Sequence, residues 1–141
     1  MKRLLLIIVT LLALVSGIVG CRASLTPSQP PAPPKAGEWV ASADFGELRF
    51  NINSASDGIT KISIKFVQFK CGGVTWESGG VTFENPTPWP ISGRKFTAKT
   101  HVNPWDFVIQ GEFDDSGLHA SGIWQVTGKN CSGKWESTRS P

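Results

Sequence analysis

The sequence predicts an all-β domain, either a small sandwich or a flattened barrel, with the sandwich favoured. Three observations carry this prediction. From Gly37 onward apolar residues alternate with polar ones at a period of two, and turn clusters recur every eight to twelve residues. No window has helical periodicity. The 141 residues include 15 Gly, 10 Pro, 8 Phe and 6 Trp but only one Met, a composition that favours strands and turns. Eight or nine short antiparallel strands fit into this length.

The first strands are marked by clean alternation. The expected inward residues are Leu48, Phe50, Ile52, Ile62, Ile64 and Phe66, with a turn at residues 54–58. The apolar phase then slips by one residue to Val67, Phe69 and Cys71, which indicates a bulge or a strand that changes faces.

The middle of the domain is expected to be a hairpin followed by a loop. Residues 77–80, Glu-Ser-Gly-Gly, lie between two short apolar segments and predict a tight turn. Residues 84–90 contain three prolines, which we expect to exclude a central strand.

Strands resume at Arg94 and continue to the end of the chain. Expected inward residues are Phe96, Ala98, Thr100, Val102, Phe107, Ile109, Gly111, Phe113, Leu118, Ala120, Gly122, Trp124, Val126, Cys131, Gly133 and Trp135, with a turn at residues 114–117. A buried Trp135 beside a disulfide is an expected centre of the core.

The amino terminus has the layout of a secretory signal. Residues 1–20 contain Lys2 and Arg3, an apolar run from Leu4 to Val15 and then small residues. The run is short for a membrane span. Ile18-Val19-Gly20-Cys21 resembles the lipobox of bacterial lipoproteins. The resemblance implies cleavage before Cys21, acylation of that cysteine and attachment to a bacterial membrane. In this family an Asp after the cysteine is associated with retention in the inner membrane, so Arg22 at that position favours the outer membrane if the organism has one. The alternatives are an incidental cysteine in an ordinary signal or an uncleaved anchor.

Residues 21–36 are expected to be the lipidated cysteine and a Pro-rich spacer, and residues 37–141 the domain. Five prolines fall within residues 25–35. In polyproline II form this spacer would hold the domain about 40 Å from the bilayer. The alternative is that it serves as a ligand for an aromatic groove.

The cysteine count predicts one disulfide. With Cys21 assigned to lipid by the lipobox resemblance, Cys71 and Cys131 remain, and an exported chain meets an oxidising compartment. The alternative is two buried thiols.

The turn and core residues of the domain resemble a small, uncharacterised β domain of exported and lipid-anchored bacterial proteins. The segments that carry the resemblance are Gly37-Glu-Trp39, Cys71, residues 109–113, residues 120–124, Cys131 and Trp135. It implies a fold and a location, and it supplies no catalytic residue.

Charge argues against a nucleic-acid partner. The chain has a formal net charge of +3, but Lys2, Arg3, Arg22 and Lys35 precede the domain. The domain then has 10 basic and 11 acidic residues, without a basic cluster interleaved with aromatics.

Catalytic constellations are not evident, so we expect no enzyme, no cofactor and no metal. A nucleophile motif is missing. His101 and His119 fall on the solvent faces of their strands. As metal ligands they would need a third partner, which only the hairpin near His119 could supply, through Glu112, Asp114 or Asp115. The carboxylates Asp106 and Glu112 lie too far apart on one strand to act as a pair.

Tryptophan is the one unusual feature of the composition. Parity directs three of the six inward, which leaves Trp39, Trp89 and Trp105 as candidates for exposure and ligand binding. Trp89 and Trp105 stand beside prolines, and we expect them to lie together at one end of the domain, where they would stack on a ligand or cap the core.

The leading functional hypothesis is a lipid-anchored, non-enzymatic module of the envelope or cell surface that binds or has a structural role. The rivals are a domain that binds carbohydrate or cell wall through its loop tryptophans, and an inhibitor or assembly partner of another envelope protein. The sequence does not indicate an oligomeric state.

Overall fold

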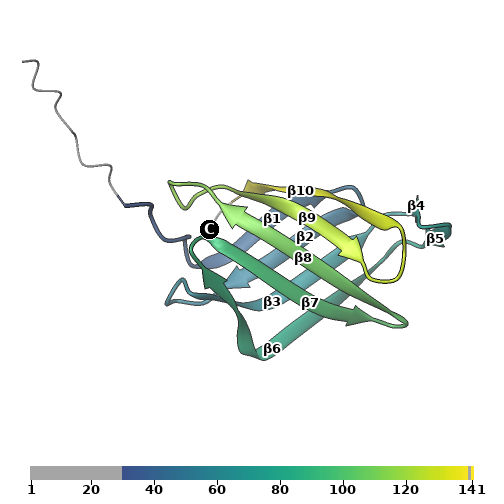
Figure 1. The fold of residues 1–141 in the computed structure, drawn as a ribbon, viewed down its shortest axis with the longest axis horizontal. Coiled ribbons are helices and arrows are strands. Elements are labelled where there is room, and N and C mark those ends of the chain that lie inside the picture. The colour runs from purple at the N-terminus through teal and green to yellow at the C-terminus, as the bar shows by residue number, and fades with distance from the viewer. Residues whose placement is uncertain (1–29, 140) are drawn as a thin grey trace, which may run out of the picture.

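The computed structural model describes residues 30–139 and 141, and all regular structure in this part of the chain is β (Figure 1). Eight strands form a closed barrel in the order β1-β10-β9-β8-β7-β6-β3-β2, and β4 and β5 form a separate two-stranded sheet. The strands are β1 (Gly37–Ala43), β2 (Gly46–Ile52), β3 (Gly58–Phe66), β4 (Phe69–Cys71), β5 (Val74–Trp76), β6 (Gly79–Ser92), β7 (Lys95–Val102), β8 (Trp105–Phe113), β9 (Ala120–Val126) and β10 (Cys131–Arg139).

The prediction of an all-β fold is confirmed, but the favoured sandwich is wrong and the barrel alternative is right. β1 pairs with β2 along its full length and also with β10, so the first and last strands join and close the sheet. Closure of this kind pairs the edges of the first and last strands, which a sandwich leaves open. The contact between β1 and β10 pairs residues as far apart in sequence as Val40 and Arg139, which local periodicity does not reveal.

Aromatic side chains fill the barrel. Trp39 stacks on Phe50 with ring centroids 5.8 Å apart, and Phe50 also meets Trp135 edge to face at 5.7 Å. An eight-stranded barrel is just wide enough for its side chains to fill the interior. The buried cluster comprises Trp39, Ala41, Phe45, Leu48, Phe50, Ile52, Ile59, Ile62, Ile64, Phe66, Phe96, Ala98, Phe107, Ile109, Phe113, Ala120, Trp124, Val126, Cys131 and Trp135. Of the expected inward residues, Leu118 is instead 53% exposed.

The expected disulfide is present. Cys71 and Cys131 are bonded, with their Cα atoms 5.2 Å apart. Because Cys131 begins β10 and Cys71 ends β4, the bridge fastens the β4–β5 hairpin to the barrel. We call this end of the molecule, with the β7–β8 and β9–β10 turns, the disulfide end (Figure 1).

The expected hairpin at residues 77–80 is wrong. Val74–Trp76 pairs with Phe69–Cys71, and the turn is Gly72-Gly73, where both residues have positive φ. Two consecutive residues with positive φ are what a two-residue hairpin turn requires, and glycine adopts that conformation without strain. Residues 77–78 instead connect β5 to β6.

The chain already contacts the barrel before Gly37. The N–H of Ala32 donates to the carbonyl of Asp115 at 2.9 Å, and that of Lys35 donates to the carbonyl of Gly117 at 3.1 Å. The indole of Trp39 donates to the carbonyl of Lys35 at 2.8 Å. Residues 32–35, which the sequence assigns to the spacer, therefore cover the β8–β9 end of the barrel, opposite the disulfide end (Figure 1).

Candidate functional site: the open seam of the barrel

The barrel has one weak join, between β6 and β7. The two strands pair only at Ile91–Phe96 and Ser92–Lys95, although β6 has 14 residues and β7 has eight. β6 bends away from β7 beyond this short ladder (Figure 1). We call the boundary between residues 79–90 and residues 97–102 the β6–β7 seam. Within the described chain, no strand pairs with β7 along this edge.

Backbone geometry shows which groups of β7 face the seam. The N–H of Phe113 donates to the carbonyl of Arg94 at 2.9 Å, and the β7–β8 register continues without a break. Residues along an antiparallel strand alternate between hydrogen bonds to one neighbour and to the other. Every second residue from Arg94 therefore bonds to β8. The residues between them, which include Lys99 and His101, direct their N–H and C=O groups toward the seam.

Prolines explain why β6 does not close this edge. The N–H of Ile91 donates to the carbonyl of Asp57, on the β3 side, so the nitrogen of the neighbouring Pro90 is directed toward β7. Pro88 stands two residues earlier, at the edge of a bulge in the pairing with β3. A proline nitrogen has no hydrogen to donate. The β6–β7 ladder therefore ends at Ile91, because the next β6 residue that faces β7 is Pro90, which has no N–H. Pro86 continues the two-residue spacing into the adjoining bulge.

The expectation that residues 84–90 form no strand is thus wrong. The segment belongs to β6, and its prolines fit because they lie on an edge and at a bulge. The register with β3 jumps from Trp89 opposite Ile59 to Glu84 opposite Lys61, so residues 85–88 stand opposite Thr60 alone.

Side chains along the seam are less covered than elsewhere in the barrel. The inward residues of β6 are only half-buried, whereas those of the other barrel strands are mostly buried. The half-buried inward residues of β6 are Val81, Phe83, Trp89 and Ile91. The interior is therefore least protected from solvent beside β7.

A buried hydroxyl without a partner lies on β7. Thr100 is 5% exposed and faces inward between Ala98 and Val102, and its Oγ1 has no hydrogen-bond partner in the described structure. An unsatisfied buried hydroxyl costs about 1–3 kcal/mol. Residues 97–102 of β7 border the seam. They therefore contain both the unsatisfied hydroxyl of Thr100 and the backbone groups that lack a strand partner.

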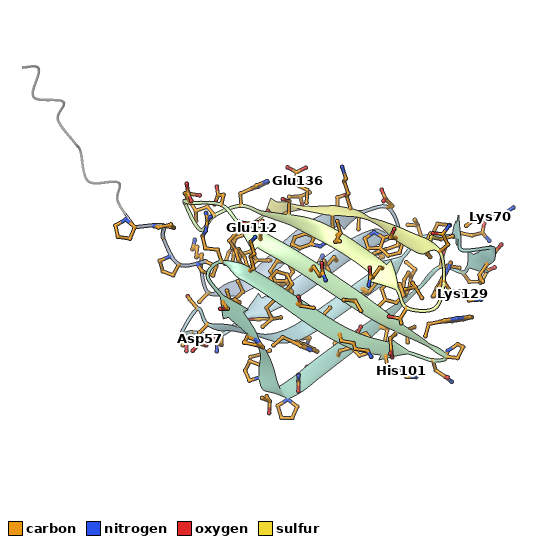
Figure 2. The ribbon with its side chains drawn as sticks, in the orientation of Figure 1. Asp57, Lys70, His101, Glu112, Lys129 and Glu136 are labelled. Atoms are coloured by element: carbon orange, nitrogen blue, oxygen red, sulfur yellow. A yellow bond between two sulfur atoms is a disulfide. The ribbon has the colours of Figure 1, made fainter. Side chains whose placement is uncertain are left out.

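A small polar cluster links β7 to β8 on the outer face of the barrel, next to the seam. Asp106 accepts from Lys99 Nζ at 2.7 Å, and its other oxygen lies 2.8 Å from His101 Nδ1. Hydrogen bonds from Lys99 and then His101 lower the pKa of the Asp106 carboxyl below its usual value. His101 lies at the lower edge of the barrel near the disulfide end (Figure 2).

At the disulfide end, the seam meets an aromatic cluster. Trp105 lies 5.8 Å from Trp76 between ring centroids, and Trp76 stacks on Phe69 at 5.8 Å. Lys129 Nζ lies 4.8 Å from the centre of the Trp105 ring, within range of a cation–π interaction. Both tryptophans are half-buried, so part of each ring reaches solvent.

The structure separates the three tryptophans that the sequence proposes as a site. Trp39 is fully buried, because Phe50, Phe113 and the segment ending at Lys35 cover it, so its expected exposure is wrong. Trp89 and Trp105 do not lie together. Trp89 is two residues from the Ile91–Phe96 pair at the start of β7, whereas Trp105 pairs with Val102 at its end. The strand between those pairs spans about 20 Å.

The other polar candidates are engaged in hydrogen bonds or ion pairs. His119 Nε2 lies 3.0 Å from Glu136 Oε1, and Glu112 lies within 4 Å of both Arg94 and Lys95. No three potential metal ligands among His, Cys, Asp and Glu gather within the described ranges.

A shallow depression of about 560 Å³ lies on the outer face of β1, β9 and β10 around Ile123. The described residues include no helix that is long and apolar enough to span a bilayer.

No protein-family model, curated protein or solved structure matches this chain.

The sequence contained an unused signal for the seam. Prolines 86, 88 and 90 recur with the two-residue period of a strand, a spacing that in a regular strand places them on one edge and removes successive donors there. The role of Thr100 could not be predicted from the sequence, because inward threonines are common and only the structure shows that this hydroxyl has no hydrogen-bond partner. Cys21, the proposed lipidation site, lies outside the described residues.

Proposed function

We propose that this protein is a lipid-anchored, non-enzymatic binding module of the bacterial envelope. The observation that carries the binding role is the seam, where an unpaired strand edge and half-buried apolar residues adjoin in an otherwise packed barrel. Side chains fill the interior, which favours a ligand bound along the seam or at the disulfide end over one enclosed by the barrel.

The anchor in this proposal is Cys21, through its lipobox resemblance. Residues 32–35 are bonded to the β8–β9 end, so a spacer of residues 22–31 would reach about 30 Å in polyproline II form. Because the chain enters at that end, the disulfide end would face away from the membrane (Figure 1). Two acyl chains hold a protein at a bilayer stably.

The non-enzymatic assignment is supported by the state of the polar side chains. On the outer face, the two histidines are hydrogen-bonded to carboxylates, and Asp106 and Glu112 form ion pairs with lysines; all four side chains are exposed or half-exposed. Catalytic acids and bases usually occupy concave sites that shield them from water.

Two measurements test the proposal. Cells that express the wild-type chain should incorporate labelled palmitate into it, and Cys21→Ser should abolish labelling and leave the protein either retained as its precursor or released from membranes. The released Cys21→Ser protein should then bind saturably to envelopes from cells that lack the wild type. Unchanged labelling would refute the anchor, and binding that never saturates would refute the binding role.

A second candidate ligand is carbohydrate, which the half-buried Trp76–Trp105 pair favours. Tryptophan rings stack on sugar rings, and Lys129 would move from the ring to the edge of the site. Trp105→Ala should then weaken binding to purified cell-wall glycan in affinity electrophoresis, whereas Trp89→Ala should not. Equal effects of the two changes would count against this site.

A further inference from the structure

We infer that the binding module takes an extended peptide of another envelope protein, which adds to β7 as a strand along the β6–β7 seam. This inference rests on the proposed binding function and specifies its ligand. The main-chain groups of the peptide would bond to the seam-facing groups of Lys99 and His101. Such strand addition derives its affinity from backbone hydrogen bonds and its specificity from alternate side chains.

The edge of β7 is suited to accept a strand. It has no strand partner over residues 97–102, and the sequence from Lys95 to Val102 contains neither proline nor glycine. Its register with β8 has no bulge, so the backbone groups on its free edge are regularly spaced. Proteins usually protect such an edge with proline, a bulge or a covering segment. Here those devices lie on β6 instead, at Pro86, Pro88, Pro90 and the bulge.

The side chains beside β7 define the chemistry of the peptide. A strand paired with β7 directs alternate side chains inward, toward the half-buried Val81 and Phe83 and the hydroxyl of Thr100. Inward positions therefore suit small apolar residues with one Ser or Thr that satisfies Thr100 Oγ1. The residues opposite Lys99 and His101 point outward into solvent and suit polar or acidic side chains.

A small apolar ligand inside the barrel is a weaker explanation of the same seam. The buried aromatics leave the interior occupied, whereas an extended peptide needs space only beside β7. A small molecule would also leave the backbone groups of Lys99 and His101 unpaired. An extended peptide accounts for the unpaired backbone, the half-buried apolar row and the unpaired hydroxyl together.

The first test is a selection of peptides on the exported Cys21→Ser protein. A displayed library of random linear ten-residue peptides should yield proline-free sequences that alternate apolar and polar residues. Lys99→Pro should lower their affinity at least tenfold, because it removes a seam-facing N–H without removing a β7–β8 hydrogen bond. The matched control Lys99→Ala keeps the N–H and should bind within twofold. Thr100→Val should lower the affinity about tenfold without lowering the thermal midpoint.

The second test uses the unsubstituted domain and so does not depend on whether the proline variant folds. Amide exchange of Lys99 and His101 should be fast in the free Cys21→Ser protein and at least tenfold slower with a selected peptide bound. Exchange of Ala98 and Thr100, whose amides bond to β8, should change little. Sedimentation velocity should show one protein per peptide.

Several results would overturn the inference. These are a selection that enriches no peptide, slow exchange of Lys99 and His101 in the free protein, and peptides that bind Lys99→Pro normally. Dimers that form through this edge would also overturn it, since the occupant would then be a second copy. If Trp105→Ala abolishes saturable envelope binding while Lys99→Pro does not, strand addition fails but the binding module stands.

Discussion

The indole of Trp135 lies against the backbone of Gly122 inside the barrel, where a Cβ on the glycine would stand 2.8 Å from Nε1. That same Nε1 donates to the carbonyl of Gln110 at 3.0 Å. Gly111 pairs with Gly122 across β8 and β9, and a Cβ there would also meet the Trp135 ring. The glycine pair therefore makes the space in which the largest side chain of β10 is buried and its N–H satisfied.

Replacing Gly122 with alanine should strongly destabilise the barrel. The new methyl would collide with the Gln110 carbonyl and the indole, both of which are fixed by the fold. Overpacking of this kind costs about 1–3 kcal/mol or more. Chemical denaturation of Gly122→Ala should show this loss. Gly79→Ala is the matched control, because a Cβ at Gly79 meets nothing within 4 Å, and it should unfold like the wild type. Equal midpoints for the two variants would contradict the packing argument.

The disulfide should contribute a large part of the stability. It links residues 60 apart, for which the chain-entropy model gives about 4 kcal/mol. The double variant Cys71→Ser/Cys131→Ser should lose about this much free energy of unfolding, and reductant should shift the wild-type midpoint but not that of the variant. A wild type insensitive to reductant after full reduction of the bond would show that the bridge does not stabilise the fold.

Trp39 should behave as a core residue and not as a binding residue. It is fully buried, and deletion of a buried tryptophan costs about 3–5 kcal/mol. Trp39→Ala should therefore lower the thermal midpoint far more than Trp89→Ala, whose side chain is only half-buried. Trp39→Phe keeps most of the ring but loses the bond to Lys35, so it should cost less than the alanine change. A small effect of Trp39→Ala would contradict this assignment.

Stability should fall in acid partly through Asp114. The hydroxyl of Ser116 and then the backbone N–H groups of the turn lower the pKa of its carboxyl below the usual value. A carboxyl with a lowered folded-state pKa stabilises the fold above its unfolded pKa of about 3.9, and this contribution is lost as the pH falls through the folded-state value. Asp114→Asn should reduce the difference in thermal midpoint between pH 6 and pH 3. An unchanged difference would exclude this role.

Local alternation predicted the strands well because it depends only on which side chains face the core. Leu48, Phe50 and Ile52 are buried as expected. Closure was harder to predict, since it depends on the pairing of β1 with β10 at the two ends of the domain. The exposure of Trp39 failed for a related reason: Phe50 and Phe113 pack against its ring from distant positions in the sequence, and its N–H bonds to Lys35, in a segment whose prolines resemble a spacer. Predicting the seam would have required knowing which strand edge each proline of β6 faces and how β6 pairs with β3.

Removal of the segment before Gly37 should destabilise the barrel, although its proline-rich sequence predicts a spacer. Ala32 and Lys35 of the segment donate to the β8–β9 turn, and Trp39 of β1 donates to the carbonyl of Lys35; each of these hydrogen bonds contributes about 1 kcal/mol. A protein that begins at Gly37 should therefore unfold about 2–3 kcal/mol more easily than one that begins at Pro30. Lys35→Ala in the longer protein keeps the backbone groups and should change little. Gly117→Ala should resemble the truncation, because its φ of 67° disfavours alanine and its Cβ would strike the Pro33 carbonyl. Equal denaturation midpoints for the two lengths would show that residues 32–35 do not support the fold.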